Sequence, residues 1–522
     1  MHPITEVTPM KIPSSILRQI YTFGSLSNVK EGIRFALKNQ ISDSSLTEVR
    51  KVAIDGKEID LDRVNLRIAN EDHPATEVKP ENPLPFHIGQ KVDVYLSGME
   101  LELERTYKLE FSFRTKKFGV LTFDVEDKVP RQVKRKVSIP YDKESNYEDE
   151  IIKKRQDFVK DYTGVELKHV PHYSFDPHLT RGNIENFTGV AQVPLGLAGP
   201  LRINGEYANG DFIIPLAASE GTLVASYNRG MKVLNLSGGV TTTFSVDRMQ
   251  RAPVFIFDTA RGARDFSKWV ENNEKKIARL AEATSRVAKL KSIERFLSNR
   301  FVFLRFNYTT GDAAGQNMVG KATFFACSWI MENYEGIRNF YLESNFATDK
   351  KGSQVNILQT RGKRVTAEAT IPREILLKEL RVEPETLEAH SRAGTLGAFI
   401  SGANNNGLQA ANAITAMFIA TGQDVANVAE SSCGILYTDI TEDGDFYLSL
   451  TLPSLIVATY GGGTGLPTQK ECLDILGCYG DGKVRKFAEI VTAVALAGEL
   501  SLAAAISSLE WVSSHDEMGR NR

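Results

Sequence analysis

The chain has few of the residues that form covalent or metal cross-links. Its 522 residues include four cysteines and eight histidines. No two cysteines form a C-x-x-C pair, and no histidine or cysteine cluster has metal-ligand spacing, so we expect neither a disulfide framework nor a metal site. The cysteines are expected to be small, buried, apolar residues in a reducing compartment: Cys327, Cys433, Cys472 and Cys478.

The sequence also lacks a strong net charge and a long hydrophobic run. The formal net charge is −2, unlike the basic footprint of nucleic-acid-binding proteins, so no nucleic-acid partner is expected. The N-terminal residues contain no apolar core of a signal peptide. The most apolar stretch, 490–509, is interrupted by Glu499 and is mostly Ala, Ser and Gly, which favours a buried helix over a membrane span. These features predict a cytoplasmic protein.

The composition is that of a globular chain, with 42% hydrophobic and 25% charged residues. At roughly 100–200 residues per domain, the length predicts about three domains. Alternating apolar and polar residues in 91–96 and 107–113 predict half-buried strands, so residues 1–140 are expected to be a β-rich domain. The charged stretch 133–154 is expected to be a linker that enters a helix.

Beyond residue 180, helical and strand-like patterns alternate. Residues 264–297 carry apolar side chains at helical spacing, and a strand-like run follows at 301–306. A second helical pattern covers 318–334, and a further strand-like run covers 339–342. This alternation predicts a compact α/β subdomain of roughly 90 residues.

Two segments are candidates for binding a phosphorylated cofactor. The turn 311–317 joins a strand to a helix, and its small residues let a ligand approach the helix N-terminus. It lacks the G-x-G-x-x-G fingerprint, so a purely structural turn is the alternative. Ser285 and Arg286, expected on the preceding helix, suit a 2′-phosphate, although a surface arginine is the simpler interpretation.

Four titratable side chains are candidates for catalysis. Glu220, among apolar and small residues, is either a general acid or a carboxylate that caps a helix N-terminus. Lys350 either stabilises a developing oxyanion or belongs to a solvated loop. Asp424 is either a turn former or a buried partner for a lysine. His515 is either a proton donor that closes over a site or a solvated tail residue.

In their order along residues 180–522, these motifs resemble one family, the 3-hydroxy-3-methylglutaryl-CoA reductases of the NADPH-using type. The residues that carry the resemblance are the runs 184–189, 193–201, 220–226, 311–318, 347–351, 422–424, 459–464 and 514–515. The N-terminal domain has no family that we recognise, so it is a soluble module of unknown role. The resemblance implies an α+β fold in which a small ferredoxin-like cofactor subdomain, 252–341, is inserted into a large catalytic domain, 141–251 and 342–522.

The resemblance also implies an activity: reduction of the CoA thioester to mevalonate and CoA, with two NADPH per turnover and no metal, in the mevalonate pathway of isoprenoid synthesis. Lys350 would stabilise the oxyanion, and Glu220 would supply a proton at the aldehyde step. Asp424 would hydrogen-bond Lys350, and His515 would protonate the departing thiolate. The family resemblance further implies a homodimer or higher oligomer with its sites at the subunit interface.

The same resemblance assigns the binding residues. Those expected to hold the acyl end of the substrate are Arg251, Lys351, Arg392 and Asn412. Those expected to hold the cofactor are Ser285, Arg286, Asp312, Gly315, Gln316 and Asn317. The arginine beside a serine favours NADPH over NADH.

The chain departs from the family pattern near the acyl group. Glu343 replaces a common serine, Gln409 a common histidine, Arg392 a usual lysine and Ala314 a usual methionine. An ionised carboxylate would repel an anionic substrate unless Glu343 points away or Ser344 serves instead. Two alternatives therefore stay open: a reductase of a different acyl-CoA thioester, and a non-catalytic protein that binds CoA and NADP.

Overall fold

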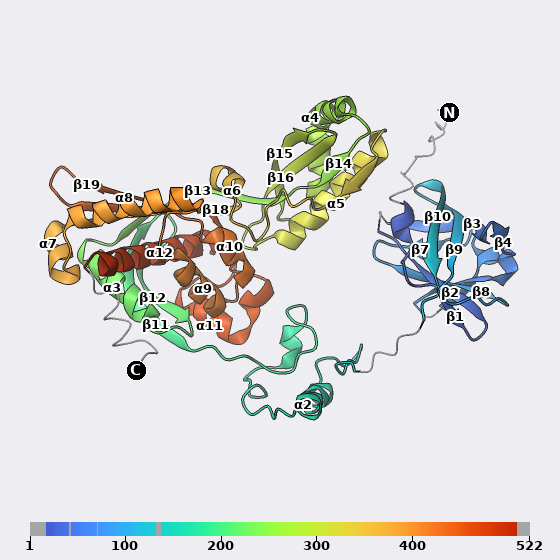
Figure 1. Ribbon diagram of the computed structural model, residues 1–522, viewed down its shortest axis with the longest axis horizontal. Helices are drawn as coiled ribbons and strands as arrows, with labels where there is room; N and C mark the ends of the chain where they lie inside the picture. Colours follow the sequence, from blue (N-terminus) through green and yellow to red (C-terminus); the bar gives the residue numbers. More distant parts are fainter. Residues whose placement is uncertain (1–16, 41–42, 70, 132–136, 509–522) are drawn as a thin grey trace.

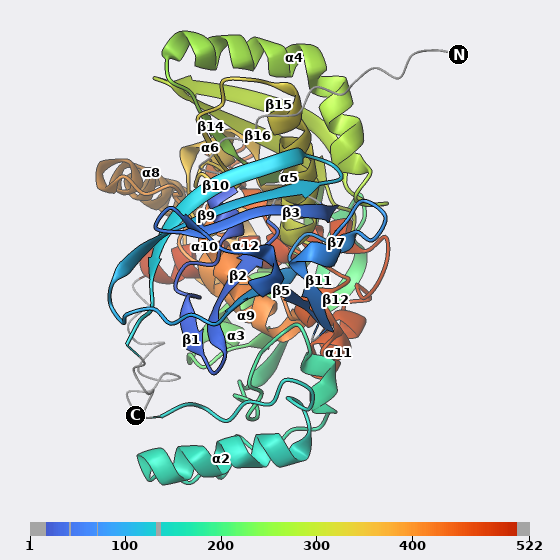
Figure 2. The same ribbon diagram turned by 90° about the vertical axis from the view of Figure 1, so that its right-hand side faces the viewer.

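The N-terminal part of the chain is a sandwich of two β-sheets (Figure 1 and Figure 2). The computed structural model describes residues 17–40, 43–69, 71–131 and 137–508. One sheet has the order β1-β2-β8-β5-β6 and the other has the order β10-β9-β3-β4, with β7 paired to β3. The rings of Phe35 on β2 and Phe111 on β9 lie 5.1 Å apart, so the buried faces of the two sheets pack together.

The strands of this sandwich confirm both alternating segments that the sequence predicts. The bounds are β1 (Ser27–Val29), β2 (Gly32–Lys38), β3 (Ser44–Ile54), β4 (Lys57–Glu58), β5 (Val64–Ile68), β6 (Glu71–Pro74), β7 (Leu84–Phe86), β8 (Lys91–Ser97), β9 (Thr106–Thr115) and β10 (Gly119–Lys128). Short 3-10 turns lie at η1 (Arg18–Ile20), η2 (Leu61–Arg63) and η3 (Ala75–Glu77).

The charged segment after the sandwich leads into helix α2 (Asp149–Thr163), as predicted, and then into the turn η4 (Pro177–Thr180). Arg155 on α2 is buried, and its guanidinium donates to the carbonyl oxygens of Pro140, Asn146 and Phe187. One arginine therefore ties the helix to chain segments on both sides of it.

A ferredoxin-like subdomain follows, as the family resemblance implies. Its elements occur in the order β14 (Val254–Ile256), α4 (Ala260–Glu282), β15 (Lys289–Ser298), β16 (Phe301–Thr309), α5 (Gln316–Asn333) and β17 (Asn339–Tyr341). The strands lie in the order β17-β14-β16-β15, and each neighbouring pair is antiparallel. This is the split β-α-β arrangement of the ferredoxin-like fold.

The prediction of one helix across 264–297 is wrong. Helix α4 ends at Glu282, and the second half of that segment is strand β15. The Ser285 hydroxyl oxygen accepts hydrogen bonds from the backbone of Val287 and Ala288, at 3.2 and 3.1 Å. Such local bonds compete with helical ones and favour a turn. Ser285 and Arg286 therefore lie in the turn between α4 and β15, not on a helix.

The large domain is built on strands that continue the sheet of the small subdomain. Strand β13 pairs with β16 through Arg251 and its two preceding residues, so one sheet crosses from one domain to the other. The strands are β11 (Leu195–Gly205), β12 (Asn209–Ala217), β13 (Val240–Arg251), β18 (Gly362–Ile371), β19 (Ile435–Ile440) and β20 (Phe446–Leu455). The helices and turns are α3 (Leu223–Leu236), α6 (Gln354–Gln359), α7 (Arg373–Ile375), η5 (Leu376–Leu380), α8 (Pro384–Ser401), α9 (Ala410–Thr421), η6 (Val425–Asn427), α10 (Val428–Ser431), η7 (Gly462–Gly465), α11 (Pro467–Ile475) and α12 (Val484–Ser507).

Helix α12 forms the centre of the large domain, where Figure 1 shows it enclosed by α3, α9 and the sheet. In the described part of the chain it is the one helix long and apolar enough to cross a membrane, but 78% of its most apolar window is buried. The predicted buried helix is thus confirmed. Its packing is close, because a Cβ atom at Gly230 of α3 would lie 1.9 Å from the carbonyl oxygen of Ala497.

Candidate active site

Lys350 and Asp424 form the ion pair at the centre of the candidate site. Nζ of Lys350 lies 2.9 Å from Oδ2 of Asp424. Asp424 follows α9, whose C-cap is Gly422 in the left-handed conformation (φ 69°). The Asp424 Oδ1 accepts a hydrogen bond from the backbone N–H of Ala426. Asp424 therefore forms a turn and also partners a lysine, but it is not the buried partner expected, because 41% of its side chain is exposed.

The ion pair favours the charged form of the lysine. The hydrogen bond to Asp424 is the main cause that raises the pKa of Lys350 above its ordinary value, and the charges of Asp349 and Glu430 act in the same direction. Lys350 is therefore an ammonium at neutral pH. A half-exposed ammonium can donate a hydrogen bond to an oxygen that becomes negative during a reaction.

The loop that carries Lys350 has an unusual backbone. It joins β17 to α6, and Asn345, Thr348 and Lys350 have φ values of 67°, 55° and 57°. Residues other than glycine adopt this region when the surroundings hold them there. The backbone N–H of Lys350 donates to Oε1 of Glu430 at 3.0 Å.

Two buried charged residues next to this loop are absent from the sequence prediction. Arg361 and Glu430 are fully buried, and Arg361 bonds both Oδ1 of Asp349 at 2.6 Å and Oε1 of Glu430 at 3.4 Å. A buried guanidinium needs such partners because an isolated charge is costly away from water. No local pattern marks either residue, since their partners lie far away in the sequence.

Arg251, at the end of β13, is already paired with a carboxylate of the chain. Its Nη1 lies 2.5 Å from Oε2 of Glu343, and its Nη2 donates to the backbone oxygen of Gln316 at 3.2 Å. Its Nε is buried and has no hydrogen-bond partner among the described residues. Glu343 does not point away from the predicted acyl site, and Ser344 is engaged with the carbonyl of Ala252.

The predicted cofactor turn lies between a strand and a helix, as expected. Gly315 precedes the first turn of α5 with φ 87°, and no side chain caps this helix N-terminus. The side-chain amide of Gln316 donates to Asp349 at 3.1 Å and to Asn427 at 2.9 Å, so this turn contacts the Lys350 loop directly. Asn317 is exposed.

Asp312 has a structural contact that the sequence does not reveal. Its carboxylate accepts from the backbone N–H groups of Gly482, Lys483 and Val484, at 2.8, 3.0 and 3.1 Å. The residue thus anchors the small subdomain to the start of α12. Both carboxylate oxygens therefore already accept hydrogen bonds from the backbone of the chain.

The turn with Ser285 and Arg286 lies beside the predicted cofactor turn. A Cβ atom at Gly311 would lie 2.8 Å from Cγ1 of Val287. Arg286 is exposed in the same turn. The two segments that the sequence proposes for a phosphorylated cofactor are therefore neighbours in space.

Other predicted residues are not assembled around Lys350 within the described part of this single chain. Glu220 is exposed between β12 and α3, and the N-cap of α3 is Thr222, so Glu220 does not cap the helix. Arg392 lies on exposed α8 and pairs with Glu388. Asn412 is exposed on α9, and Nζ of Lys351 lies 3.2 Å from the backbone oxygen of Asp349. His515 lies outside the described residues.

The four cysteines are free and buried, so the prediction that they are buried residues is confirmed. Burial raises the pKa of each thiol, to about 12 for Cys478. A thiol of raised pKa is a poor nucleophile because the thiolate is the reactive form.

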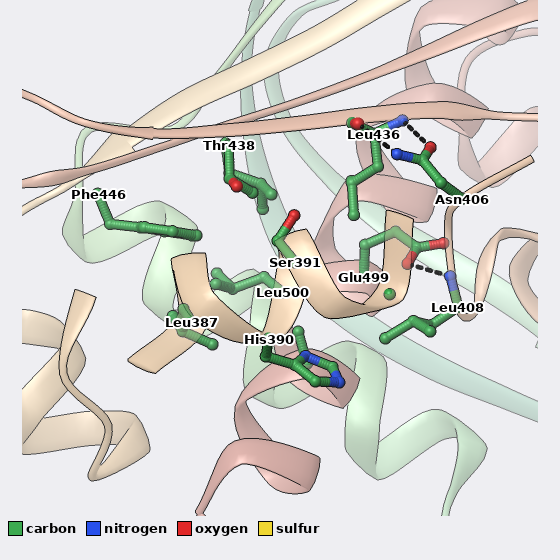
Figure 3. Close-up of a pocket in the computed structure, with 13 residues that line it drawn as sticks. Leu387, His390, Ser391, Asn406, Leu408, Leu436, Thr438, Phe446, Glu499 and Leu500 are labelled. Carbon is green, nitrogen blue, oxygen red and sulfur yellow. Dashed lines mark hydrogen bonds between the residues drawn. The ribbon is translucent and has the colours of Figure 1, made fainter. Parts of the chain in front are cut away.

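A small, largely apolar cavity lies between α8, β19, β20 and α12, and Figure 3 shows its lining. Glu499 borders this cavity and is fully buried. Its carboxylate accepts from the backbone N–H groups of Leu408, Gln409 and Ala410 at 2.6 to 2.8 Å. Glu499 therefore caps α9, whose other end leads to Asp424.

A family model described as hydroxymethylglutaryl-coenzyme A reductase matches residues 151–520. The chain belongs to this family. A second model, described as hydroxymethylglutaryl-CoA reductase, N-terminal domain, matches residues 16–130. The β-sandwich, for which the sequence analysis finds no family, thus has a counterpart within the family.

Similar proteins include two archaeal 3-hydroxy-3-methylglutaryl-coenzyme A reductases. The relative from Pyrococcus abyssi is 44% identical over 369 residues, which cover 68% of this chain and 90% of the relative. The relative from Methanothermobacter thermautotrophicus is 42% identical over 375 residues, which cover 71% and 94% of the two chains.

A solved structure shares the fold at lower identity. The class II 3-hydroxy-3-methylglutaryl-CoA reductase from Streptococcus pneumoniae bound to NADPH in open conformations aligns with a TM-score of 0.52 and 20% identity. The alignment covers 63% of this chain and 89% of that chain. The predicted α+β family fold is confirmed.

Replacing Asp424 with asparagine tests the ion pair. Asp424→Asn removes the charge that stabilises the ammonium, so the pKa of Lys350 should fall and the alkaline limb of the kcat–pH profile should move to lower pH. We expect kcat at neutral pH to fall roughly 100-fold. Steady-state turnover from pH 6 to about 11, beyond the ordinary lysine pKa, measures both effects, with the exposed-turn variant Asp443→Asn as control. An unchanged alkaline limb in Asp424→Asn would contradict the assignment.

Proposed function

We propose that this chain reduces 3-hydroxy-3-methylglutaryl-CoA to mevalonate and free CoA, with two NADPH and two protons consumed per turnover. Membership of the reductase family supports the reaction. The observation that carries the proposal in this chain is the Lys350–Asp424 ion pair, at 2.9 Å, next to the cofactor turn. Thioester reduction requires a donor for the carbonyl oxygen, and a fixed ammonium supplies one.

Different residues of the chain stabilise the negative charge and transfer the protons. Lys350 donates a hydrogen bond to the thioester oxygen and then to the aldehyde oxygen, which become negative in turn. Asp424 keeps the lysine protonated. We assign Glu220 the proton delivered at the aldehyde step and His515 the proton taken by the CoA thiolate, since a thiolate leaves more readily when an acid is near.

The residues around α5 fit a phosphorylated dinucleotide. The uncapped N-terminus of α5 offers backbone N–H groups to a phosphate, and the exposed Arg286 lies on the neighbouring turn. We propose that these groups, with Ser285, Gly315, Gln316 and Asn317, hold NADPH, whereas Asp312 acts by anchoring the turn. When bound, NADPH supplies hydride.

The acyl end of the substrate has an anionic carboxylate, which calls for cations. Arg251 is suited to this role because it is only 16% exposed and has an unpartnered Nε. We propose that Arg251, Lys351 and Asn412 contact this end of the substrate. Bidentate guanidinium–carboxylate pairing is the strongest contact available to such a group.

We further propose that the active enzyme is a cytoplasmic homodimer or higher homo-oligomer. The exposed face of α8 carries Leu396, Phe399 and Ile400, with exposed fractions of 59%, 83% and 74%. Contiguous apolar residues of this size are typical of protein interfaces. Arg392 lies on the same helix, so a second copy that covers α8 would receive Arg392 at its own acyl site.

The central experiment is an NADPH oxidation assay with 3-hydroxy-3-methylglutaryl-CoA. We expect one CoA released for two NADPH oxidised, a lower KM for NADPH than for NADH, and a loss of turnover of at least about 1000-fold in Lys350→Ala. A thiol reagent measures CoA, and absorbance measures NADPH. Folded wild-type protein that turns over no acyl-CoA would refute the proposal and favour a non-catalytic binding protein.

Mixed oligomers test whether Arg392 serves a second subunit. Lys350→Ala and Arg392→Ala chains, each inactive alone, are co-expressed with different tags. Random assembly makes about half of the dimers mixed. If the two residues of one site come from different chains, each mixed dimer has one intact site of two, so about a quarter of wild-type activity should return. No recovered activity in purified mixed dimers would assign both residues to the same chain.

A second candidate function is reduction of a different acyl-CoA thioester. The Arg251–Glu343 pair favours it, because an internal carboxylate already neutralises the guanidinium that would bind the substrate's carboxylate. Under this alternative the acyl group needs no negative charge. Under the first proposal, the substrate displaces Glu343 at a cost in affinity.

A comparison of acyl-CoA substrates separates the two candidates. If the dicarboxylic substrate is correct, Glu343→Ser should lower its KM about tenfold by removing the competing carboxylate, and should leave the KM for NADPH unchanged. The panel contains 3-hydroxy-3-methylglutaryl-CoA and uncharged branched acyl-CoA thioesters. Glu374→Ser, which changes a glutamate on α7, serves as control. A higher wild-type kcat/KM for an uncharged thioester would favour the second candidate.

A further inference from the structure

Two buried charged residues, Arg361 and Glu430, contact the Lys350 loop and have no part in the proton transfers proposed above. Arg361, at the start of β18, is fully buried and bonds Asp349 from one side and Glu430 from the other. Its Nη1 also donates to the backbone oxygen of Gln250 at 3.1 Å. The arginine is thus fixed by the strand that leads to Arg251.

Glu430 connects this cluster to the backbone of the catalytic lysine. It lies on α10, and its Oε1 accepts from both the Lys350 N–H, at 3.0 Å, and Nε of Arg361, at 3.4 Å. Its Oε2 is buried and has no hydrogen-bond partner among the described residues. Burial raises the pKa of Glu430, whereas the Lys350 N–H and Arg361 favour the carboxylate.

One short segment therefore holds Lys350 at two points. Asp424, at the start of η6, binds its ammonium, and Glu430, at the end of the same segment, binds its main-chain N–H. Lys350 has φ 57°, a conformation that side-chain-bearing residues adopt only when the surroundings impose it. The distance between the two anchors sets the direction of the lysine side chain.

We propose that Glu430, backed by Arg361, is a positioning residue that fixes the main chain of Lys350 so that its ammonium faces the reacting carbonyl. This assignment rests on the proposed reductase function. Glu430 touches neither substrate nor cofactor; it acts through Lys350. The same cluster reaches the cofactor turn, because Asp349 accepts from both Arg361 and the side chain of Gln316.

Because Glu430 lies close to Lys350, its replacement should change the pKa of Lys350, which can be measured. The charged groups that face Lys350 are Asp424, Asp349 and Glu430, with Arg361 behind the last two. Removing the negative charge of Glu430 lowers the pKa of Lys350. It also leaves the positive charge of Arg361 less fully neutralised, and this positive charge lowers the pKa of Lys350 further. A merely structural residue would not move the titration of Lys350.

The test compares Glu430→Ala and Glu430→Gln in the full-length enzyme. Glutamine keeps the acceptor for the Lys350 N–H but not the charge. We expect kcat to fall about 100-fold in Glu430→Ala and about tenfold in Glu430→Gln, with both KM values within about twofold of wild type. The alkaline limb of the kcat–pH profile should move to lower pH in both.

The matched control is Glu489, a second buried glutamate that accepts backbone N–H groups, in this case those of Tyr207 and Ala208. Glu489→Gln and Glu489→Ala should lower the melting temperature without moving the pH profile, when assayed well below the melting transition. Wild-type kcat in Glu430→Ala, or a change in KM alone, would overturn the proposal.

A measurement without turnover separates failure of this proposal from failure of the reductase function. The rate at which an amine-selective acylating reagent labels Lys350 is followed by mass spectrometry as a function of pH. In Glu430→Gln, labelling at pH 9 should be at least about twofold faster than in wild type, because more of the lysine is deprotonated. Equal rates would overturn the proposal even if the enzyme is active.

Discussion

The burial of helix α12 is the constraint on which the catalytic domain depends. The helix is enclosed by α3, α9 and the strands β11, β13, β18 and β20, and both of its buried carboxylates bind neighbouring backbone segments. Glu489 holds the hairpin between β11 and β12, and Glu499 caps α9. Asp312 of the small subdomain binds the first turn of the same helix. A buried carboxylate is tolerated where it replaces water for several N–H groups.

This arrangement explains how distant residues reach one site. Because Glu499 fixes the start of α9, the far end of α9 places Asp424 opposite the Lys350 loop. Because Asp312 fixes the cofactor turn to α12, Gln316 can reach Asp349. The site is therefore not a feature of one loop, since the elements that carry Asp424 and Gln316 are both anchored to the central helix.

The sequence predicts those parts of the fold and site that depend on local pattern or on ordered motifs. The alternating strands of the sandwich, the buried helix and the Lys350–Asp424 pair are of this kind. The turn after Glu282 is missed because apolar spacing in the following strand also fits a helix, while the Ser285 hydroxyl ends the helix.

Arg361 and Glu430 are missed for a different reason. Their partners are 12 and 80 residues away along the chain, and only the fold brings them together. The pairing of Arg251 with Glu343 spans 92 residues, so composition and spacing cannot reveal it. Glu220 is recognised by its motif, yet it is exposed in the structure of the single chain.

The place of α12 in the chain has a consequence for biosynthesis. All strands of the N-terminal sandwich precede residue 129, so this domain can fold while the rest of the chain is still being made. The large domain cannot close its core until residues 484–507 emerge from the ribosome, because α3, α8, α9 and four strands pack on them. During that interval the apolar faces of α3, α9 and the sheet have no internal cover, and nascent chains in this condition are the ones that depend on chaperones.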